Sequence, residues 1–334
     1  MSIHLPEGYR SSLDLYETQS SISLIKRVFE EKLTAALNLK RVSAPLFVLK
    51  STGLNDDLDG KVEPVHFTAP FIDKECVIVH SLAKWKRMAL YNYNFYEGNG
   101  LYTDMNAIRK DEKIDNLHSI YVDQWDWEKV INKDQRNSEY LHDTVSKIHE
   151  CILETLDALK AKHPSIKTEL QKKLYFFDSE EVLQMYPGLD AKQREYALLK
   201  QYKSVFIQRI GPVLSDGLPH DDRAADYDDW RLNGDLLYYN ELLDCAFEIS
   251  SMGIRVDEDS LIAQLKAKNE EYKLQYKYHQ MILNRQLPYT IGGGIGESRL
   301  CMLLMGKAHI GEVQSSIWDD ETLDYCKERN VIIL

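Results

Sequence analysis

The order of periodic segments constrains the fold of this chain more than any other feature. Apolar residues recur every three or four positions over residues 20–39 and 138–162, a spacing typical of helices that bury one face. The chain has predicted helices at both ends and a block of predicted strands between them. These strands are joined by short charged loops and lie at residues 98–109, 117–130, 174–177, 205–210, 234–239 and 246–251. Because these strands do not alternate regularly with crossover helices, we expect an α+β fold, with a mostly antiparallel sheet flanked by helices.

Shorter signals complete this prediction. Residues 41–49 are predicted as one strand that Pro45 interrupts. A strand over residues 76–80 leads into a helix that Ser81 can cap. A long helix is expected over residues 259–284, and a last apolar helix should end near Met305.

The composition indicates one compact body rather than two tethered domains. The 9 prolines and 16 glycines of this 334-residue chain cluster at a handful of points, and no low-complexity linker occurs. We therefore expect one domain over residues 1–334, with residues 1–17 as a polar, variable extension.

Charge and cysteine content argue against several classes of protein. The net charge of −12 counts against a broad basic face for nucleic acid, but it allows a small basic pocket for a phosphorylated ligand. No apolar run approaches the ~20 residues of a membrane helix, and residues 1–6 lack the features of a secretory signal. Five scattered cysteines without a C-x-x-C pair favour reduced thiols in a cytoplasm.

Residues 117–130 place polar and aromatic side chains on opposite faces of one predicted strand. Because side chains alternate with a period of two, Gln124 and Asp126 share a face, while Trp125 and Trp127 share the other. An amide beside a carboxylate suits a zwitterionic ligand such as an amino acid. A solvated sheet face is an equal alternative on this evidence alone.

Two other features point to a nucleotide, although no P-loop or dinucleotide fingerprint occurs. Arg109 ends the predicted strand 98–109 beside a charged loop, where its forked side chain could bind an α-phosphate or could be a hairpin-tip charge. The glycine run 292–296 could let backbone approach a flat ring or a phosphate, and Arg299 follows it in a helix. A tight strand-to-helix turn is the alternative there.

Together these features resemble the catalytic core of class II aminoacyl-tRNA synthetases. Pro45, after a long helix, resembles the first and dimer-forming motif of that family. The second and third motifs resemble residues 109–127 and 292–299, with matching positions at Arg109, Glu112, His118, Gly292, Gly294, Gly296 and Arg299. The order and spacing of the three motifs agree, so the joint resemblance is stronger than any one part.

Within that superfamily the chain is more similar to the ammonia-dependent aspartate ligases, the AsnA-type asparagine synthetases. The resemblance covers about residues 20–318 and is carried by His80–Arg87, Tyr121–Trp127, Asp226–Trp230, Leu232–Asp235, Phe247–Arg255 and Ile291–Leu300. It implies a single catalytic domain that converts aspartate, ATP and ammonia to asparagine, AMP and pyrophosphate. In the implied mechanism the β-carboxylate attacks the α-phosphorus, giving β-aspartyl-AMP, and ammonia then displaces AMP.

The resemblance also implies which residues bind the nucleotide. The ATP site would comprise Arg109, Arg299, Glu248, Gly294 and Gly296. Arg109 would hold the α-phosphate and the attacking carboxylate, and Arg299 would cover adenine or the distal phosphates. Asp235 and Glu248 would hold Mg²⁺ across a hairpin through hard oxygen ligands.

A second implied set binds aspartate. Lys86 and Arg255 would hold the α-carboxylate, because the β-carboxylate has to face the phosphate. The rest of the pocket would comprise Asp126, Asp56, Gln124, Ser81, Asp228 and Ser251. Asp126 and Asp56 would take the α-ammonium, helped by Gln124 and Ser81.

Two of these positions need further comment. Strict alternation turns Ser251 away from Glu248, so its place in the site requires a bend in the strand. Asp56 is the first candidate for taking a proton from the incoming ammonium. The implied catalytic set is then Arg109, Gln124 and Asp56.

We expect a homodimer with twofold symmetry, because the helix over residues 20–39 has an apolar stripe that needs cover. The expected ligands are L-aspartate, ATP, ammonia and Mg²⁺, with neither nucleic acid nor membrane. Two alternatives stay open: a tRNA-charging enzyme of the same fold, and a non-catalytic paralogue that binds an amino acid or adenylate. The first would need an anticodon module, and the retained charged residues count against the second.

Overall fold

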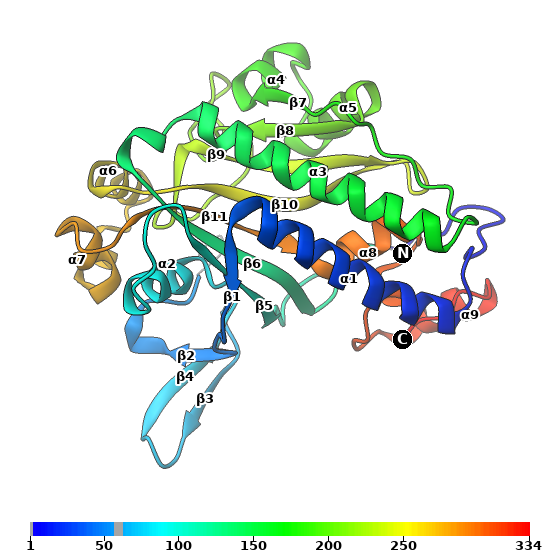
Figure 1. The fold of residues 1–334 in the computed structure, drawn as a ribbon, viewed down its shortest axis with the longest axis horizontal. Coiled ribbons are helices and arrows are strands. Elements are labelled where there is room, and N and C mark those ends of the chain that lie inside the picture. The colour runs from blue at the N-terminus through cyan, green and yellow to red at the C-terminus, as the bar shows by residue number, and fades with distance from the viewer. Residues whose placement is uncertain (1–2, 57–62) are drawn as a thin grey trace.

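The computed structural model describes residues 3–56 and 63–334, and an eight-stranded sheet runs through the molecule (Figure 1). Its order is β1-β5-β6-β11-β10-β9-β8-β7. The strands are β1 (Leu39–Arg41), β5 (Gly100–Ile108), β6 (Tyr121–Ile131), β7 (Tyr175–Asp178), β8 (Ser204–Gln208), β9 (Asp228–Asn240), β10 (Cys245–Arg255) and β11 (Tyr289–Gly296). The outer pairs β1–β5 and β7–β8 are parallel and the inner pairs antiparallel, which confirms the predicted α+β fold.

Helices α1 (Leu15–Leu37), α3 (Ser138–Lys162) and α8 (Glu297–Met305) cover one face of this sheet. Helices α1 and α3 run side by side across it (Figure 1). On the other face, α4 (Ser179–Met185) and α5 (Ala191–Tyr202) pack at the β7–β8 edge. The group α2 (Ala83–Asn92), α6 (Glu258–Lys268) and α7 (Lys277–Leu283) lies at one end, and α9 (Asp320–Glu328) lies near the C-terminus (Figure 1).

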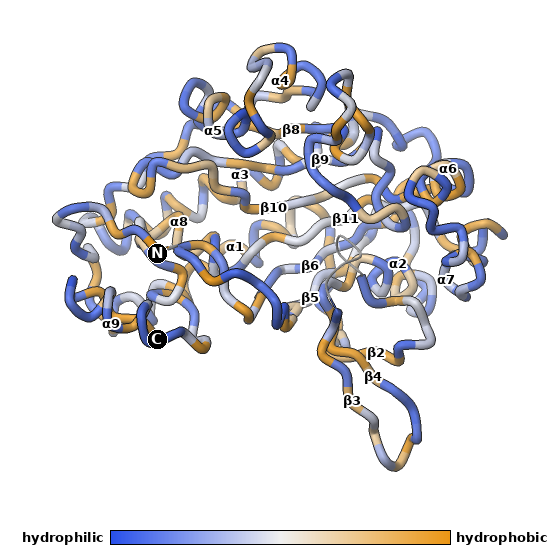
Figure 2. Tube along the Cα trace, turned by 180° about the vertical axis from the view of Figure 1, so that it is seen from behind, coloured by the Kyte–Doolittle hydropathy of each residue, from blue (hydrophilic) through white to orange (hydrophobic). Residues whose placement is uncertain are grey.

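A second sheet of three strands projects from the body as an arm. It contains β2 (Phe47–Leu49), β3 (His66–Ala69) and β4 (Lys74–Ile78) in the order β2-β4-β3. The view from behind shows the same projection (Figure 2). The prediction of one strand over residues 41–49 is therefore wrong: its two ends belong to different sheets, and Pro45 lies between them, where the chain leaves one sheet for the other.

Three helix boundaries also differ from the prediction. Helix α1 begins at Leu15 rather than near Ser20, because Asp14 and Glu17 form a capping box. Residues 259–284 are not one helix: α6 ends at Lys268 with Asn269 as its C-cap (φ 58°), and a 3₁₀ turn, η3 (Glu271–Gln275), separates it from α7. Helix α2 is capped at Leu82, although the Ala83 amide does donate to Ser81 Oγ (3.3 Å).

The apolar stripe of α1 is buried inside the chain. Ile25, Phe29 and Leu33 have no exposed surface, and the Phe29 ring lies 4.7 Å from the ring of Trp125. The stripe therefore needs no cover from a second subunit, and this argument for a homodimer was wrong. The α1 face packs against apolar side chains of β6 and α3.

Residues near the two termini pack on each other. Leu5 contributes to a small apolar cluster with Ala308, Cys326 and Val331, and the Tyr9 hydroxyl donates to Glu312 (3.0 Å). The five cysteines are all free thiols. Among the helices of residues 3–56 and 63–334, none is long and apolar enough to cross a bilayer.

Candidate active site

A cavity of about 330 Å³ opens on the sheet face opposite α1 and α3. Strands β6, β10 and β11 form its floor, and the start of α2 and the loop before β9 close it. The sequence-predicted site residues that line it are Asp56, Ser81, Lys86, Arg109, Gln124, Asp126, Asp228, Glu248, Ser251, Arg255, Gly294, Gly296 and Arg299. Asp235 is the predicted site residue that is not among the lining residues.

Strand register explains why residues so far apart in sequence meet here. Asp126 on β6 is opposite Gly294 on β11, Gly294 is opposite Ser251 on β10, and Ser251 is opposite Asp235 on β9. Residues paired across neighbouring strands share one face of a sheet. Four strands therefore present one row of side chains on the cavity side, while Trp125 faces α1.

The glycines of β11 make room for polar side chains of β6. A Cβ on Gly294 would overlap Gln124 Oε1 and lie 2.7 Å from Asp126 Oδ1, and one on Gly292 would overlap Glu128 Oε2. A side chain at position 294 would therefore displace the polar ends of Gln124 and Asp126 from where they lie in the cavity.

A bulge in β10 brings Glu248 and Ser251 to the same face. Glu248 pairs with Leu237 and Ser250 with Leu236, so Ile249 is an extra residue in the strand. The extra residue shifts the alternation by one. The bend that Ser251 requires is therefore present, and both side chains line the cavity.

Two buried cations, Lys86 and Arg255, lie at one end of the cavity. Three carboxylates surround them, and we call this group of five residues the acidic floor (Lys86, Arg255, Asp126, Glu128 and Asp228). Lys86 Nζ lies 3.2 Å from Asp126 Oδ1 and donates to the Gly293 carbonyl (2.8 Å). Burial lowers the pKa of Lys86, and Asp126 opposes that shift. Arg255 donates to Glu128 through Nη2 (2.7 Å) and to Asp228 through Nη1.

These carboxylates hold Arg255 in its charged form. Burial opposes the charge, but Glu128 and Asp228 raise the pKa of Arg255 well above its ordinary value. The prediction did not assign Glu128 a role, although the alternation along β6 places it on the same face as Gln124 and Asp126. Its pairing with Arg255 depends on β11 separating β6 from β10, which no local pattern shows.

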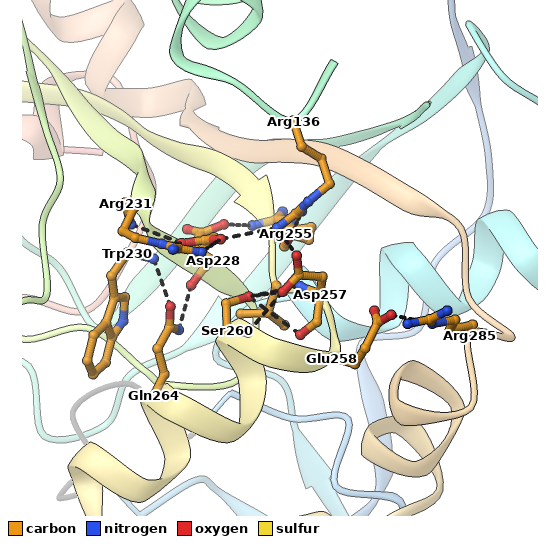
Figure 3. Close-up of polar contacts among 12 residues, drawn as sticks. Arg136, Asp228, Trp230, Arg231, Arg255, Asp257, Glu258, Ser260, Gln264 and Arg285 are labelled. Carbon is orange, nitrogen blue, oxygen red and sulfur yellow. Dashed lines mark hydrogen bonds and ion pairs between the residues drawn. The ribbon is translucent and has the colours of Figure 1, made fainter. Parts of the chain in front are cut away.

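A buried network behind the acidic floor fixes the backbone that carries Asp228 and Arg255 (Figure 3). Arg136 donates to the Arg255 carbonyl, to Asp229 (3.1 Å) and to Asp257 (3.0 Å), which caps α6. Gln264 of α6 donates to the Asp228 carbonyl (2.9 Å). Segments from β9, β10, α6 and the turn before α3 therefore meet at one crosslinked point.

Asp56 lies at the edge of the same floor. Its carboxylate accepts a hydrogen bond from Ser81 Oγ (3.0 Å), and the Asp126 carboxylate accepts one from the Leu82 amide (3.2 Å). Tyr227, which the prediction missed, also lines the cavity. Burial raises the pKa of Tyr227 well above its ordinary value, and Asp56 and Asp228 add to this shift, so the phenol stays protonated.

The other end of the cavity is rich in arginine, and we call it the arginine end (Arg109, Arg223 and Arg299 around Glu248). Arg299 Nη1 donates to the Glu248 backbone carbonyl (3.2 Å). Burial disfavours the charge of the Glu248 carboxyl, but Arg299 and Arg223 together with Lys192 and Arg109 hold its pKa below the ordinary value. A carboxylate in this position stays ionised at neutral pH.

The predicted metal pair fits a divalent cation only in part. Glu248 offers an ionised carboxylate to the cavity, as a hard cation requires. Both oxygens of Asp235 accept hydrogen bonds from Arg223 Nη2. Burial raises the pKa of Asp235 to about 7, with Arg223 opposing and Glu248 adding to the shift. In this arrangement Arg223 binds both oxygens of Asp235, and Glu248 is the member of the pair that lines the cavity.

The prediction also missed a polar group that lines the cavity. Asp123 accepts hydrogen bonds from Ser298 Oγ (2.7 Å) and from Gln314 Nε2 (3.0 Å), and both Asp123 and Gln314 line the cavity. Arg223 belongs to the acidic run 221–229, where its single positive charge was a signal that could have been noticed.

Comparison with known proteins places this geometry in a family. The family model AsnA, described as aspartate-ammonia ligase, matches residues 16–330. The chain is 54% identical over 331 residues to an aspartate–ammonia ligase of Clostridium tetani, covering 99% of this chain and 97% of that protein. It is 53% identical to one of Ligilactobacillus salivarius, with both chains fully covered.

Solved structures show the same fold at low identity. The asparaginyl-tRNA synthetase of Entamoeba histolytica in complex with asparaginyl-adenylate superposes with a TM-score of 0.65 at 13% identity, over 90% of this chain and 66% of that one. The aspartyl-tRNA synthetase of the same organism gives 0.62 at 15%, over 91% and 59%. The chain thus spans about two thirds or less of these synthetases, and the likeness confirms a class II synthetase-like core.

Proposed function

The chain belongs to the aspartate–ammonia ligase family, and on that premise we propose how its residues divide the work of ATP-dependent asparagine synthesis from aspartate and ammonia. The relatives match over nearly their whole length, which sets aside the tRNA-charging and non-catalytic alternatives. The cavity itself is the main support for this division, because the acidic floor and the arginine end open into one space of about 330 Å³.

We propose that activation takes place between Arg109 and Gln124. The β-carboxylate of aspartate attacks the α-phosphorus, the bond to the bridging oxygen breaks, and pyrophosphate leaves with the electron pair. Arg109 lines the cavity, and its buried Nε has no acceptor among the described residues. A half-buried guanidinium whose buried Nε is an unused donor favours an anionic ligand, here the α-phosphate with its developing charge.

Aspartate is proposed to lie with its α-carboxylate on the acidic floor. Lys86 and Arg255 are the buried cations there, and Asp126 is close enough to Lys86 (3.2 Å) to receive the α-ammonium beside it. Reversing the substrate would put the β-carboxylate on this floor, away from Arg109. The orientation therefore decides which carboxylate is activated.

Ammonia then attacks the acyl carbon of β-aspartyl-AMP, and AMP leaves with the electron pair of the acyl–oxygen bond. Ammonium, the main species at neutral pH, has to lose a proton first. We propose Asp56 as the acceptor, because its buried carboxylate lies at the edge of the floor beside Ser81 and near Tyr227.

Mg²⁺ is proposed to bind through Glu248, with Asp235 joining it when Arg223 turns away. When bound, the cation would neutralise phosphate charge. The support is the ionised Glu248 carboxylate inside the cavity and the second carboxylate of Asp235, which is near enough to Glu248 for that residue to raise the pKa of Asp235.

Assembly and location are proposed on separate grounds. The segment around Pro45 exposes Leu46 and Phe47, each by nearly half, which would suit a twofold contact. A single mass equal to one chain at micromolar concentration, with full activity, would contradict a homodimer. The five free thiols fit a reducing cytoplasm.

Product analysis tests the function directly. Purified protein with aspartate, MgATP and ammonium is expected to form asparagine and AMP in equal amounts. Without ammonium, pyrophosphate formation should stop after about one turnover and no free AMP should be released, because the adenylate stays bound. Formation of ADP and phosphate, or AMP formation that requires tRNA, would contradict the proposal.

A further inference from the structure

Arg223 is a cavity residue that none of the proposed roles above uses as a ligand. It lies in the loop before β9, and Asp235 binds its Nη2 with both carboxylate oxygens. The side chain is 14% exposed, and its Nε is buried without an acceptor in the described part of the chain. One guanidinium therefore has an acidic partner on one side and an unused donor.

Its position joins the two ends of the cavity. Arg223 lowers the pKa of Glu248 and Asp235 at the arginine end, and it also lowers that of Asp228 on the acidic floor. A charge felt at both ends lies near the junction where aspartate and the triphosphate have to meet. Arg109, from the loop after β5, and Arg299, from α8, also line the cavity.

Buried hydrogen bonds fix the backbone around Arg223, whereas its long side chain has room to change partner. Asp226 accepts hydrogen bonds from Lys84 Nζ (3.0 Å) and from His279 (2.9 Å), all fully buried. The Ala224 carbonyl accepts from Trp230 Nε1 (3.1 Å), and the Ala225 carbonyl accepts from Gln264 (3.0 Å). The guanidinium can thus change partner by side-chain rotation, without movement of the loop.

We propose that Arg223 exchanges Asp235 for the β- and γ-phosphates of ATP and stabilises the departing pyrophosphate. The inference rests on the proposed function, in which Asp235 and Glu248 serve the cation that bridges these phosphates. As the carboxylate oxygen bonds to the α-phosphorus, the bond to the bridging oxygen breaks and its electron pair stays on pyrophosphate. A planar fork of N–H donors beside Asp235 matches that growing charge.

Binding measurements with two nucleotides localise this role. Titration calorimetry with Mg²⁺ would compare the α,β-methylene analogue of ATP with AMP, for the native enzyme and Arg223→Gln. We expect the variant to bind the analogue roughly 10- to 100-fold more weakly and AMP almost unchanged, since a charge-assisted pair is lost only with the distal phosphates. Equal weakening of both ligands, or of neither, would overturn the proposal.

Matched variants separate binding from folding. Arg209→Gln removes an exposed arginine paired with Asp178 (3.3 Å), and it should change neither affinity. Arg223→Lys keeps a charge beside Asp235 but loses the fork, so its melting temperature should stay near that of the native enzyme while the analogue still binds more weakly.

The exchange itself has a second test that needs no divalent cation. In magnesium-free buffer, Asp235→Asn removes the competitor for Arg223, so the α,β-methylene analogue should bind several-fold more tightly than to the native enzyme. Weaker or equal binding would contradict the exchange. If the native enzyme makes asparagine and AMP while these affinity changes are missing, the inference fails and the proposed function stands.

Discussion

The guanidinium of Arg136 donates a hydrogen bond to the backbone carbonyl of Arg255, the residue whose own side chain reaches into the cavity (Figure 3). Arg136 also binds Asp229 and Asp257, and its side chain is only 7% exposed. Because Asp229 follows Asp228, one arginine fixes the main chain behind both Arg255 and its carboxylate partner. The orientation of the acidic floor therefore depends on a residue that does not line the cavity.

Arg136→Gln should raise the KM for aspartate about tenfold, equivalent to about 1.4 kcal/mol, and leave the KM for ATP nearly unchanged. The reason is that Arg255 loses its fixed main chain while the arginine end keeps its contacts. Steady-state kinetics with each substrate varied in turn would measure this split.

Arg285→Gln provides a control in the same region. Arg285 pairs with Glu258 on the surface and is 75% exposed, so its removal should move neither KM. Equal increases in both KM values for Arg136→Gln, together with a lower melting temperature, would show a purely structural role for Arg136.

Arg109→Ala should reduce turnover on the order of 10²–10³-fold while weakening ATP binding far less, because its charge matters most as the α-phosphorus becomes five-coordinate. Single-turnover formation of the adenylate would measure the chemical step, and equilibrium binding would measure ATP. Arg41→Ala, at an exposed pair with Asp104, serves as the control. Near-normal turnover of Arg109→Ala would contradict a role for Arg109 in the reaction.

Lys86→Met should weaken aspartate binding by about 2–5 kcal/mol and spare ATP, since the α-carboxylate loses a buried cation and Asp126 loses its partner. The KM for aspartate reports this loss. β-Alanine, which has an amine and one carboxylate but no α-carboxylate, should be a poor substrate for the native enzyme. AMP formation from β-alanine as fast as from aspartate would contradict the proposed grip.

His309 should make the protein less stable in mild acid. Burial lowers its pKa from about 6.5 to about 4, and its Nδ1 accepts from the Gly311 amide (3.0 Å). Between these values the unfolded chain binds a proton that the folded chain does not, so stability falls as pH falls through this window.

His309→Asn keeps an acceptor for the Gly311 amide and removes the titration. Its free energy of unfolding should therefore change less between pH 7 and pH 5 than that of the native protein, as measured by urea denaturation. His4→Asn, at an exposed position, should leave the native pH dependence intact. Identical slopes for His309→Asn and the native protein would exclude His309 as the source.

The cavity floor could be predicted because alternation along one strand is a local property. Gln124 and Asp126 share the cavity face, and Trp125 turns to the core, as the period of two requires. The fold class could be predicted for the same reason, since helical and strand periods are visible without tertiary contacts. Periodicity does not show which role each of these residues has in the reaction.

What the sequence could not show depends on contacts between distant segments. Ser251 reaches the cavity through a bulge at Ile249, which alternation cannot reveal. Asp235 was predicted as a Mg²⁺ ligand, and its contact with Arg223 from a neighbouring loop could not be seen in the sequence. The stripe of α1 predicted an unpartnered surface, yet α3 and β6 bury it, because apolar periodicity shows that a face is covered and not what covers it.

Transfer of oxygen from aspartate to AMP tests the central claim most directly. Aspartate labelled with ¹⁸O in the β-carboxylate would be converted with MgATP and ammonium, and the AMP would be analysed by mass spectrometry. We expect one ¹⁸O atom in each AMP, because the β-carboxylate oxygen that attacks the α-phosphorus leaves with it when ammonia displaces the nucleotide. AMP without the label, or label in pyrophosphate, would contradict activation of the β-carboxylate as an acyl adenylate.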